Sequence, residues 1–187
     1  MSKKLTLLRH AKSSWDDYKL QDFDRPLSPR GIKAAPRIGK FLFEKSLLPD
    51  LVLCSPAKRT RETLARSLPR LPKETEIRFD KMIYSAGMGD SVVELVKTAP
   101  DNKQHILIVG HNPTMQELAL SFPLWNEAQE EIRQKILRKF STCAVASFDV
   151  DIEKWEELAF GKAELTHFIT PKLLTSNEAG EKVHSKQ

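Results

Sequence analysis

The stretch Lys4-Leu5-Thr6-Leu7-Leu8-Arg9-His10 decides the fold that we expect for this chain. Its residues 5–8 form a short, mostly apolar run, which predicts a buried strand. The run stops at Arg9 and His10, two polar residues that an apolar strand has no packing reason to carry. Ligands of open α/β sheets lie at the carboxyl ends of the strands. We therefore expect Arg9 and His10 to form part of an anion-binding site that contains a nucleophile.

Two further strands end in the same way. Residues 50–54 precede Ser55-Pro56, and the β-branched run 105–109 precedes the segment Gly110-His111-Asn112-Pro113. An apolar run without alternation is typical of a strand that is buried on both faces of a parallel sheet. Repeated strand-then-helix units predict an α/β fold, with a mostly parallel central sheet and helices on both faces. The polar strand ends would then share one edge of the sheet.

Helix signals follow these strands. Ser28-Pro29 is expected to supply an N-cap and a first helical residue. The helix should run to about Lys45 and should be bent or interrupted at Pro36. Ser55-Pro56 and Asn112-Pro113 are expected to start two later helices in the same manner.

The remaining elements carry weaker signals. The polar segment 14–24 is turn-rich, with Trp15 and Tyr18 as expected local anchors. Further expected elements are a strand at 75–79, a turn at 85–90, a helix at 91–98, an amphipathic segment at 127–140 and late strands at 142–150 and 165–170.

The chain has 187 residues, of which 40% are hydrophobic and 29% charged, enough for one domain with a real core. We expect this domain to span residues 1–171 and residues 172–187 to form a polar, disordered tail. No apolar run approaches the roughly 18 residues of a membrane helix, and no secretory signal is recognisable. Cys54 and Cys143 lie in apolar runs and are expected to be buried thiols of a reducing compartment. We therefore expect a cytoplasmic protein without a membrane partner.

The net charge is +5 and the sequence pI is about 9.2. A nucleic acid, an acidic protein or a phosphorylated substrate could explain this balance. The positive charges are interleaved with 25 acidic residues and form no long basic block. We therefore expect no nucleic-acid partner.

The polar strand ends carry the groups that phosphoryl transfer needs. Arg9 and Arg59 offer planar, multi-donor guanidinium groups that suit phosphate. His10 can attack phosphorus and form a covalent phosphohistidine. His111, if protonated, can stabilise charge on an equatorial oxygen in the transition state. The helix that follows His111 adds backbone N–H groups near the anion.

Each of these residues taken alone has a plainer interpretation. Arg9 could form a salt bridge at the strand end, and His10 could be an ordinary hydrogen-bonded histidine. Arg59 lies in a basic helix start that could simply face solvent, and His111 could be a turn residue. The argument therefore depends on all of them sharing one edge of the sheet.

Other site types fit less well. The Cys-x5-Arg spacing of cysteine phosphatases, counted from Cys54, ends at Thr60. The sequence contains no Walker glycine loop. His105 and His111 are too far apart along the strand for a convincing metal site, and His167 is expected to be structural. We expect no metal and no cofactor.

Four motifs together resemble one family. Leu8-Arg9-His10-Ala11-Lys12-Ser13 resembles the Arg-His-Gly signature of the histidine phosphatase (phosphoglycerate mutase-like) superfamily. Asp24-Arg25-Pro26-Leu27-Ser28, Ser55-Pro56-Ala57-Lys58-Arg59-Thr60 and Gly110-His111-Asn112-Pro113 follow in that family's order. The set is similar to the small bacterial branch of phosphohistidine phosphatases and covers roughly residues 4–171.

The resemblance implies a three-layer sandwich and roles for particular residues. His10 would be the nucleophile that accepts the phosphoryl group, and Arg9, Arg59 and His111 would complete the phosphate pocket. Further substrate-binding residues that it implies are Ser13, Lys12, Arg25 and Asn112. The partner would be a phosphorylated protein, such as a histidine-phosphorylated signalling domain, or a small phosphorylated substrate.

Two positions depart from the family pattern. Ala11 replaces the usual glycine, which reduces the backbone freedom there. The segment 81–86 contains no carboxylate where many members carry a glutamate acid, and Asp80 and Asp90 only flank it. General acid catalysis is worth about 10²–10⁴-fold, and a phosphoserine needs it more than a phosphohistidine does. The missing acid therefore favours a phosphoramidate, such as phosphohistidine, or another activated phosphate over a stable monoester. The short chain favours an open cleft that could admit a protein side chain.

Two alternatives stay open at this point. The chain could be a mutase or phosphatase of small phosphorylated metabolites, although a mutase normally needs more phosphate ligands and a covering lid. It could also be a non-catalytic module that binds phosphate and turns nothing over.

Overall fold

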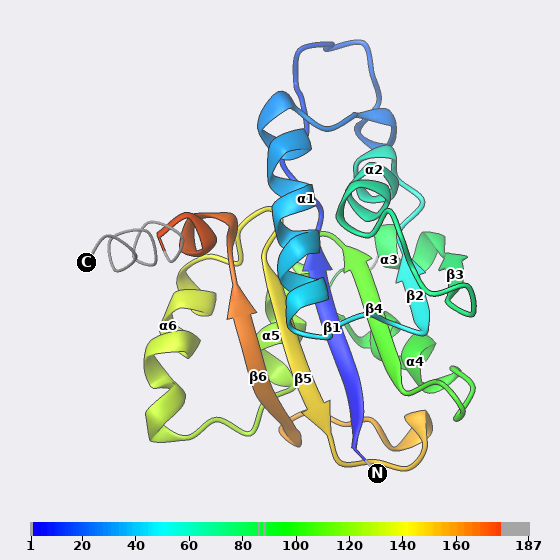
Figure 1. Ribbon diagram of the computed structural model, residues 1–187, viewed down its shortest axis with the longest axis vertical. Coiled ribbons are helices and arrows are strands. Elements are labelled where there is room, and N and C mark those ends of the chain that lie inside the picture. The colour runs from blue at the N-terminus through cyan, green and yellow to red at the C-terminus, as the bar shows by residue number, and fades with distance from the viewer. Residues whose placement is uncertain (1, 86, 88, 177–187) are drawn as a thin grey trace.

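The structure is a computed structural model that describes residues 2–85, 87 and 89–176 (Figure 1). Its centre is a six-stranded sheet with the strand order β3-β2-β4-β1-β5-β6. The strands are β1 (Lys3–Arg9), β2 (Leu51–Cys54), β3 (Glu76–Phe79), β4 (His105–Gly110), β5 (Val145–Val150) and β6 (Ala163–Ile169). Pairing is parallel from β3 to β1, and β5 runs antiparallel to both of its neighbours. The predicted α/β fold with a mostly parallel sheet is confirmed.

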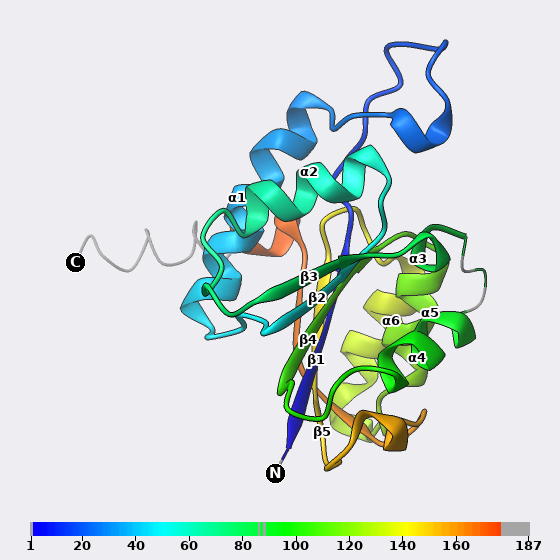
Figure 2. The same cartoon turned by 90° about the vertical axis from the view of Figure 1, so that its right-hand side faces the viewer.

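Helices cover both faces of this sheet. They are α1 (Pro29–Glu44), α2 (Lys58–Ser67), α3 (Lys81–Ser85), α4 (Asp90–Lys97), α5 (Thr114–Ser121) and α6 (Glu130–Arg138). Short 3-10 helices span Asp22–Asp24, Glu127–Gln129 and Trp155–Glu157. Figure 2 shows α1 and α2 on one face of the sheet and α3 to α6 on the other. Among the described residues, no helix combines the length and apolar character that crossing a membrane requires.

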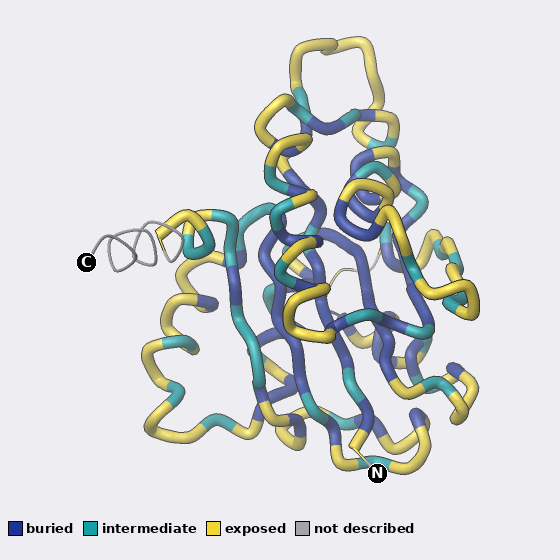
Figure 3. The backbone as a smooth tube through the Cα atoms, in the orientation of Figure 1, coloured by how far each residue is buried: buried dark blue, intermediate teal, exposed yellow. Residues whose placement is uncertain are grey.

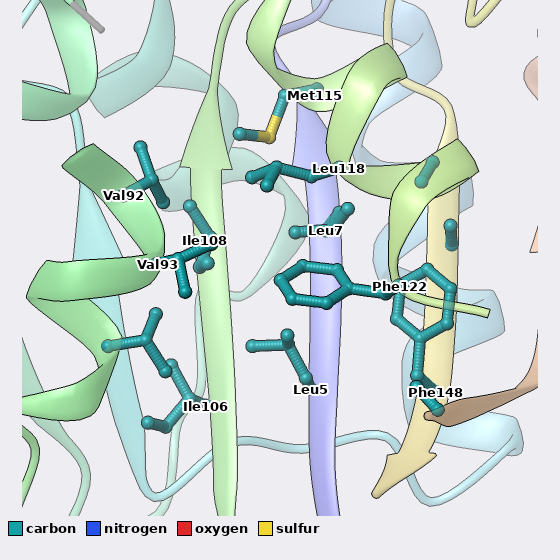
Figure 4. Packing of buried hydrophobic residues seen from close by; sticks show 14 of the residues in the cluster. Leu5, Leu7, Val92, Val93, Ile106, Ile108, Met115, Leu118, Phe122 and Phe148 are labelled. Atoms are coloured by element: carbon teal, nitrogen blue, oxygen red, sulfur yellow. The ribbon is translucent and has the colours of Figure 1, made fainter. Parts of the chain in front are cut away.

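The alternation of side chains along β1 divides the core into two clusters. Leu5 and Leu7 face α4 and α5, where they pack with Phe122 (Figure 4). Leu8 lies in the other cluster, with Ile38 of α1. Fully burying one such side chain is worth about 1.5–3 kcal/mol. Since β1 is buried on both faces, its carboxyl end is held firmly in the middle of the sheet.

The predicted start of α1 is confirmed, and the helix is not interrupted at Pro36. The Ser28 hydroxyl accepts a hydrogen bond from the backbone N–H of Gly31 (3.3 Å), and Pro29 is the first helical residue. The helix continues through Pro36 to Glu44. Pro36 lies on the exposed side of α1, while the buried side of the helix packs against the core.

The other two predicted N-caps are wrong. Helix α2 begins at Lys58 with Ala57 at the N-cap position, and Pro113 rather than Asn112 occupies the N-cap of α5. The Ser55 hydroxyl accepts a long bond from the N–H of Ala57 (3.4 Å), and its shorter bond joins it to a ring nitrogen of His111 (2.8 Å). The local sequence assigns Ser55 to a helix start, but its shortest side-chain bond is to His111, which is distant in the sequence.

Three other expectations need comment. The segment 81–85 forms the short helix α3, which the sequence did not indicate. Of the two expected local anchors, Trp15 is 71% exposed but stacks on Arg25, whereas Tyr18 is 88% exposed. Residues 171–176 of the carboxyl-terminal region are helical, and residues 177–187 of the expected tail lie outside the described residues.

Both cysteines are buried and free, as expected. Burial raises the pKa of each thiol, Cys54 and Cys143, to about 12. The side chains therefore stay protonated and serve as apolar packing groups.

Helices α1 and α2 cross in close backbone contact at Gly39. A Cβ atom at this position would overlap the carbonyl oxygen of Ser67, while the Ser67 hydroxyl donates to the carbonyl oxygen of Ala35 (3.0 Å). This contact holds α2, which carries Arg59, against α1.

We predict that Gly39→Ala lowers the free energy of unfolding by about 2 kcal/mol, because overpacking at a rigid backbone contact costs roughly 1–3 kcal/mol. Urea denaturation followed by circular dichroism measures the change. Gly87→Ala is the matched control, since a Cβ there would have no neighbour within 4 Å. Equal stability of the two variants would contradict the close contact.

Candidate active site

The backbone at the carboxyl end of β1 is held from both sides. The N–H of His10 donates to the carbonyl oxygen of Gly110 at the end of β4 (3.0 Å). On the other side, the N–H of Cys143 is shared between the carbonyl oxygens of Arg9 (3.1 Å) and His10 (3.0 Å). Arg9 and His10 are therefore fixed between β4 and the loop that leads into β5.

The hydrogen bonding of His10 leaves one ring nitrogen with a free lone pair. Its Nδ1 lies 2.7 Å from the carbonyl oxygen of Ala11. A carbonyl oxygen only accepts, so Nδ1 carries the proton and donates it. The pKa of His10 is lowered to about 3, mainly by burial. Nearby His111, Arg59 and Arg9 also act to lower it, and the bond to Ala11 opposes them. The imidazole is therefore neutral near pH 7, and its Nε2 is available as a nucleophile.

His111 lies beside His10, with 5.1 Å between the ring centroids. Burial, followed by the charge of Arg59, lowers the pKa of His111 to about 4. The expected role of a protonated His111 therefore changes, because its ring is neutral near pH 7. A neutral imidazole still has one N–H to donate, which is Nδ1–H if the Ser55 hydroxyl donates to Nε2.

Two guanidinium groups complete this centre. Arg9 donates to the carbonyl oxygen of Phe140 (2.7 Å), and Asn112 donates to the same oxygen (3.1 Å). Arg59 reaches the centre from the second residue of α2. Burial and the charge of Arg59 both lower the pKa of Arg9, as expected for two cations placed near each other. The four residues predicted from the strand ends and helix starts are thus brought together at one edge of the sheet.

Unpartnered polar atoms concentrate in this centre. Arg9 Nε, His111 Nδ1 and Asn112 Oδ1 are buried and have no hydrogen-bond partner in the described part of the chain. A buried polar group without a partner costs about 1–3 kcal/mol. The two nitrogens, when they carry hydrogen, are donors that an oxyanion could accept from, so binding such a group would offset part of this cost.

Asp22 and Tyr84 belong to the centre, although the sequence analysis did not select them. The Asp22 carboxylate accepts hydrogen bonds from Arg59 (2.8 Å), Arg25 (2.9 Å) and the Tyr84 hydroxyl (3.0 Å). Partial burial alone would raise the pKa of Asp22, but the bonds from Arg59 and Tyr84 outweigh it and lower the pKa. Tyr84 also contacts the edge of the His111 ring, with 5.4 Å between centroids.

The signal for Tyr84 was partly visible in the sequence. It lies in the segment 81–86, which lacks the carboxylate expected there and brings a tyrosine to the centre. The nearby Asp80 caps α3 through the N–H of Met82 (2.7 Å), and Asp90 begins α4. Asp22 stands in a polar, turn-rich segment and carries no comparable signal.

The other expected substrate-binding residues lie around the centre in different settings. Arg25 donates to Ser13 (2.7 Å), to the carbonyl oxygen of Ser14 (3.0 Å) and to Asp22, and it stacks on Trp15. These bonds tie Ser13 and Arg25 to each other and hold the loop after β1. Lys12 is exposed.

Within the described residues, no three His, Cys, Asp or Glu side chains are placed so that they could hold a metal ion together. The arrangement at the sheet edge instead gathers cations, a neutral imidazole nucleophile and N–H donors. This combination can bind a phosphoryl group and accept it on nitrogen.

Comparison with known proteins agrees with this chemistry. A model of the histidine phosphatase superfamily (branch 1) matches residues 5–91. An uncharacterized protein of Mycobacterium tuberculosis strain H37Rv is 35% identical over 165 residues, which cover 88% of this chain and all of that protein.

Two solved structures are similar over nearly their whole length. The protein from Nakamurella multipartitia assigned as the phosphohistidine phosphatase SixA has a TM-score of 0.76 and 28% identity, covering 91% of this chain and 97% of that chain. Its counterpart from Agrobacterium tumefaciens has a TM-score of 0.73 and 26% identity, covering 91% and 99%.

The low pKa of His10 predicts an unusual pH profile. The nucleophile must be neutral, so activity is retained above its pKa of about 3 and lost only as the pH falls toward that value. We expect kcat/KM for an aryl phosphate, corrected for substrate ionisation, to stay constant as the pH falls through 6.5, the ordinary pKa of histidine. Initial rates between pH 4 and 8 measure it, with circular dichroism as the control for folding. A fall in kcat/KM with an apparent pKa near 6.5 would contradict the claim that burial keeps His10 neutral.

Proposed function

The chain belongs to the histidine phosphatase superfamily, and on this basis we propose that it is a phosphatase that works through a covalent phosphohistidine on His10. One observation carries the proposal. The Nδ1–H of His10 is bonded to the carbonyl oxygen of Ala11 (2.7 Å), while burial keeps the ring neutral. Its Nε2 is therefore a nucleophile that already lies among Arg9, Arg59 and His111.

The reaction takes place in two displacements. Nε2 of His10 forms a bond to phosphorus as the bond to the leaving group breaks. Arg9, Arg59 and the N–H of His111 donate to the equatorial oxygens and stabilise their charge. A water then attacks phosphorus, the bond to Nε2 breaks, and inorganic phosphate leaves with the protons of the water. Arg59 exchanges its bond to Asp22 for a bond to the phosphoryl group in this scheme.

The substrate that we propose is a phosphohistidine on a protein. Asp22 is the carboxylate hydrogen-bonded to Arg59, and its lowered pKa keeps it deprotonated near pH 7. It is therefore a poor proton donor for an alkoxide leaving group. A phosphohistidine whose ring is protonated leaves as neutral imidazole and needs no such donor.

The loop that precedes Asp22 supports a protein substrate. The segment 14–21 extends beyond the ends of α1 and α2 and is largely exposed (Figures 1 and 3). It presents Trp15 and Tyr18 to solvent, and aromatic side chains of this kind are enriched in protein interfaces. The next residues of the chain lead to Asp22, so a partner that contacts this loop also lies next to the phosphate pocket.

The covalent step predicts that acid-labile phosphate becomes attached to His10. Acid-free quenching during turnover of a labelled aryl phosphate, followed by mass spectrometry, should find one phosphoryl group on this residue. His10→Ala should not become labelled, and its kcat should fall by at least about 10³-fold. The loss is large because His10 is the nucleophile of the first displacement and the leaving group of the second. His167→Ala, a histidine on β6 away from the centre, is the matched control. Turnover that survives in His10→Ala would rule out the mechanism.

The substrate proposal predicts an order of kcat/KM. A phosphohistidine-containing protein should be the best substrate, and phosphoserine peptides should be slower by about 10²-fold or more, the range in which a missing general acid is felt. Phosphate release measured side by side, with sugar phosphates included, gives the order. A clear preference for sugar phosphates would replace the protein substrate with a small metabolite and leave the His10 mechanism intact.

A further inference from the structure

A basic cavity adjoins the catalytic centre at Arg9. Its volume is about 570 Å³. Its lining combines five cationic side chains with three hydroxyl-bearing ones, Ser141, Thr142 and Thr170. They come from the end of β1, the start of α1, the loop before β5 and the chain after β6. Only the folded chain brings these segments together.

The charge in this cavity is unbalanced. Five of its lining side chains are cationic, namely Arg9, Lys12, Arg30, Lys139 and Lys172, and none is acidic. None of the five forms an ion pair with an acidic residue in the described part of the chain. On α6, by contrast, Arg133 pairs with Glu130 and Lys135 with Glu131. Cations of one sign in a concave wall create a focused positive potential, which a bound anion would relieve.

The uncharged lining groups also fit an anion with several oxygens. Ser141, Thr142 and Thr170 add hydroxyl groups to the cations. Arg9 is held in place by its bond to the carbonyl oxygen of Phe140 (2.7 Å), so this side of the cavity is fixed relative to His10. A volume of a few hundred cubic ångströms is the size of a small-molecule site rather than of a flat macromolecular contact.

We infer that the basic cavity is a second anion subsite, which binds a phosphoryl-type dianion next to the phosphoryl group held at His10. The position of the first group rests on the proposed function. The second dianion has two possible sources. It is either another phosphoryl group of the same compound, as in a phosphate chain, or a separate inorganic phosphate that binds beside the substrate.

Calorimetric titration of the full chain tests the subsite without any turnover. His10→Ala is used so that no phosphoryl group is transferred, and the probes are inorganic orthophosphate and tripolyphosphate. If one chain of phosphates spans both subsites, tripolyphosphate binds one per protein and about tenfold or more tighter than orthophosphate. If the source is a separate anion, two orthophosphates bind per protein. Either result supports the second subsite and identifies its source.

The variant that removes the subsite is Lys139→Gln combined with Lys172→Gln, both exposed lysines of the cavity wall outside the catalytic centre. It should abolish the tenfold advantage of tripolyphosphate, or the second orthophosphate, and leave the first orthophosphate unchanged. Lys154→Gln combined with Lys162→Gln removes the same charge from exposed positions outside the cavity and should change neither.

The subsite is refuted if His10→Ala binds a single orthophosphate and gains nothing from tripolyphosphate. It is equally refuted if the cavity variant and the control variant weaken tripolyphosphate to the same extent, because the effect would then come from net charge alone. These outcomes are separate from those of the proposed function, which are decided by turnover and by the label on His10 in the wild-type chain.

Discussion

Burial of the imidazole of His10 among cations is the constraint on which the rest of the site depends. Its side chain is only 8% exposed and lies near two guanidinium groups, so protonation is disfavoured by both desolvation and charge. The same cations that keep the nucleophile neutral are the donors that a phosphoryl group requires. The sheet positions this combination, because β1 is buried on both faces and ends in the middle of the sheet. A nucleophile on a surface loop would be better solvated and closer to its ordinary pKa.

Asp22 shows how the protein balances the charge of this centre. Its carboxylate bonds to Arg59 and Arg25 and accepts from Tyr84, so it occupies the donors of Arg59 in the way a phosphoryl group would. In the proposed mechanism, the phosphoryl group would compete with this carboxylate for the same guanidinium. On the other side, Arg9 faces the basic cavity, which has no acidic wall. On the side of α2, Asp22 thus balances the charge of Arg59. On the side of α1, no acidic residue lines the cavity beside Arg9.

The elements that the sequence predicted well are those whose signal is local. The runs 5–8 and 105–109 are apolar without alternation, and both became strands that are buried on both faces. The N-cap at Ser28 was also recognisable, since its partner is only three residues away. Ser55 looked equally suitable as an N-cap, yet its hydroxyl bonds to His111, a residue more than fifty positions later. Local pattern cannot distinguish a cap from a long-range partner, because both use the same hydroxyl group.

By itself, the sequence determined the succession of strands along the chain and the α/β class. It also selected Arg9, His10, Arg59 and His111, because residues at the ends of parallel strands or at the start of the following helix lie toward one edge of the sheet. Only the tertiary structure decided the protonation state of the two histidines, since desolvation depends on what surrounds them in space. It also decided that Asp22 and Tyr84 join the centre and that five cations from distant segments share one cavity. Those side chains have no spacing in common, and their meeting follows from the way α1 and the segments beside β5 and β6 pack around the end of β1.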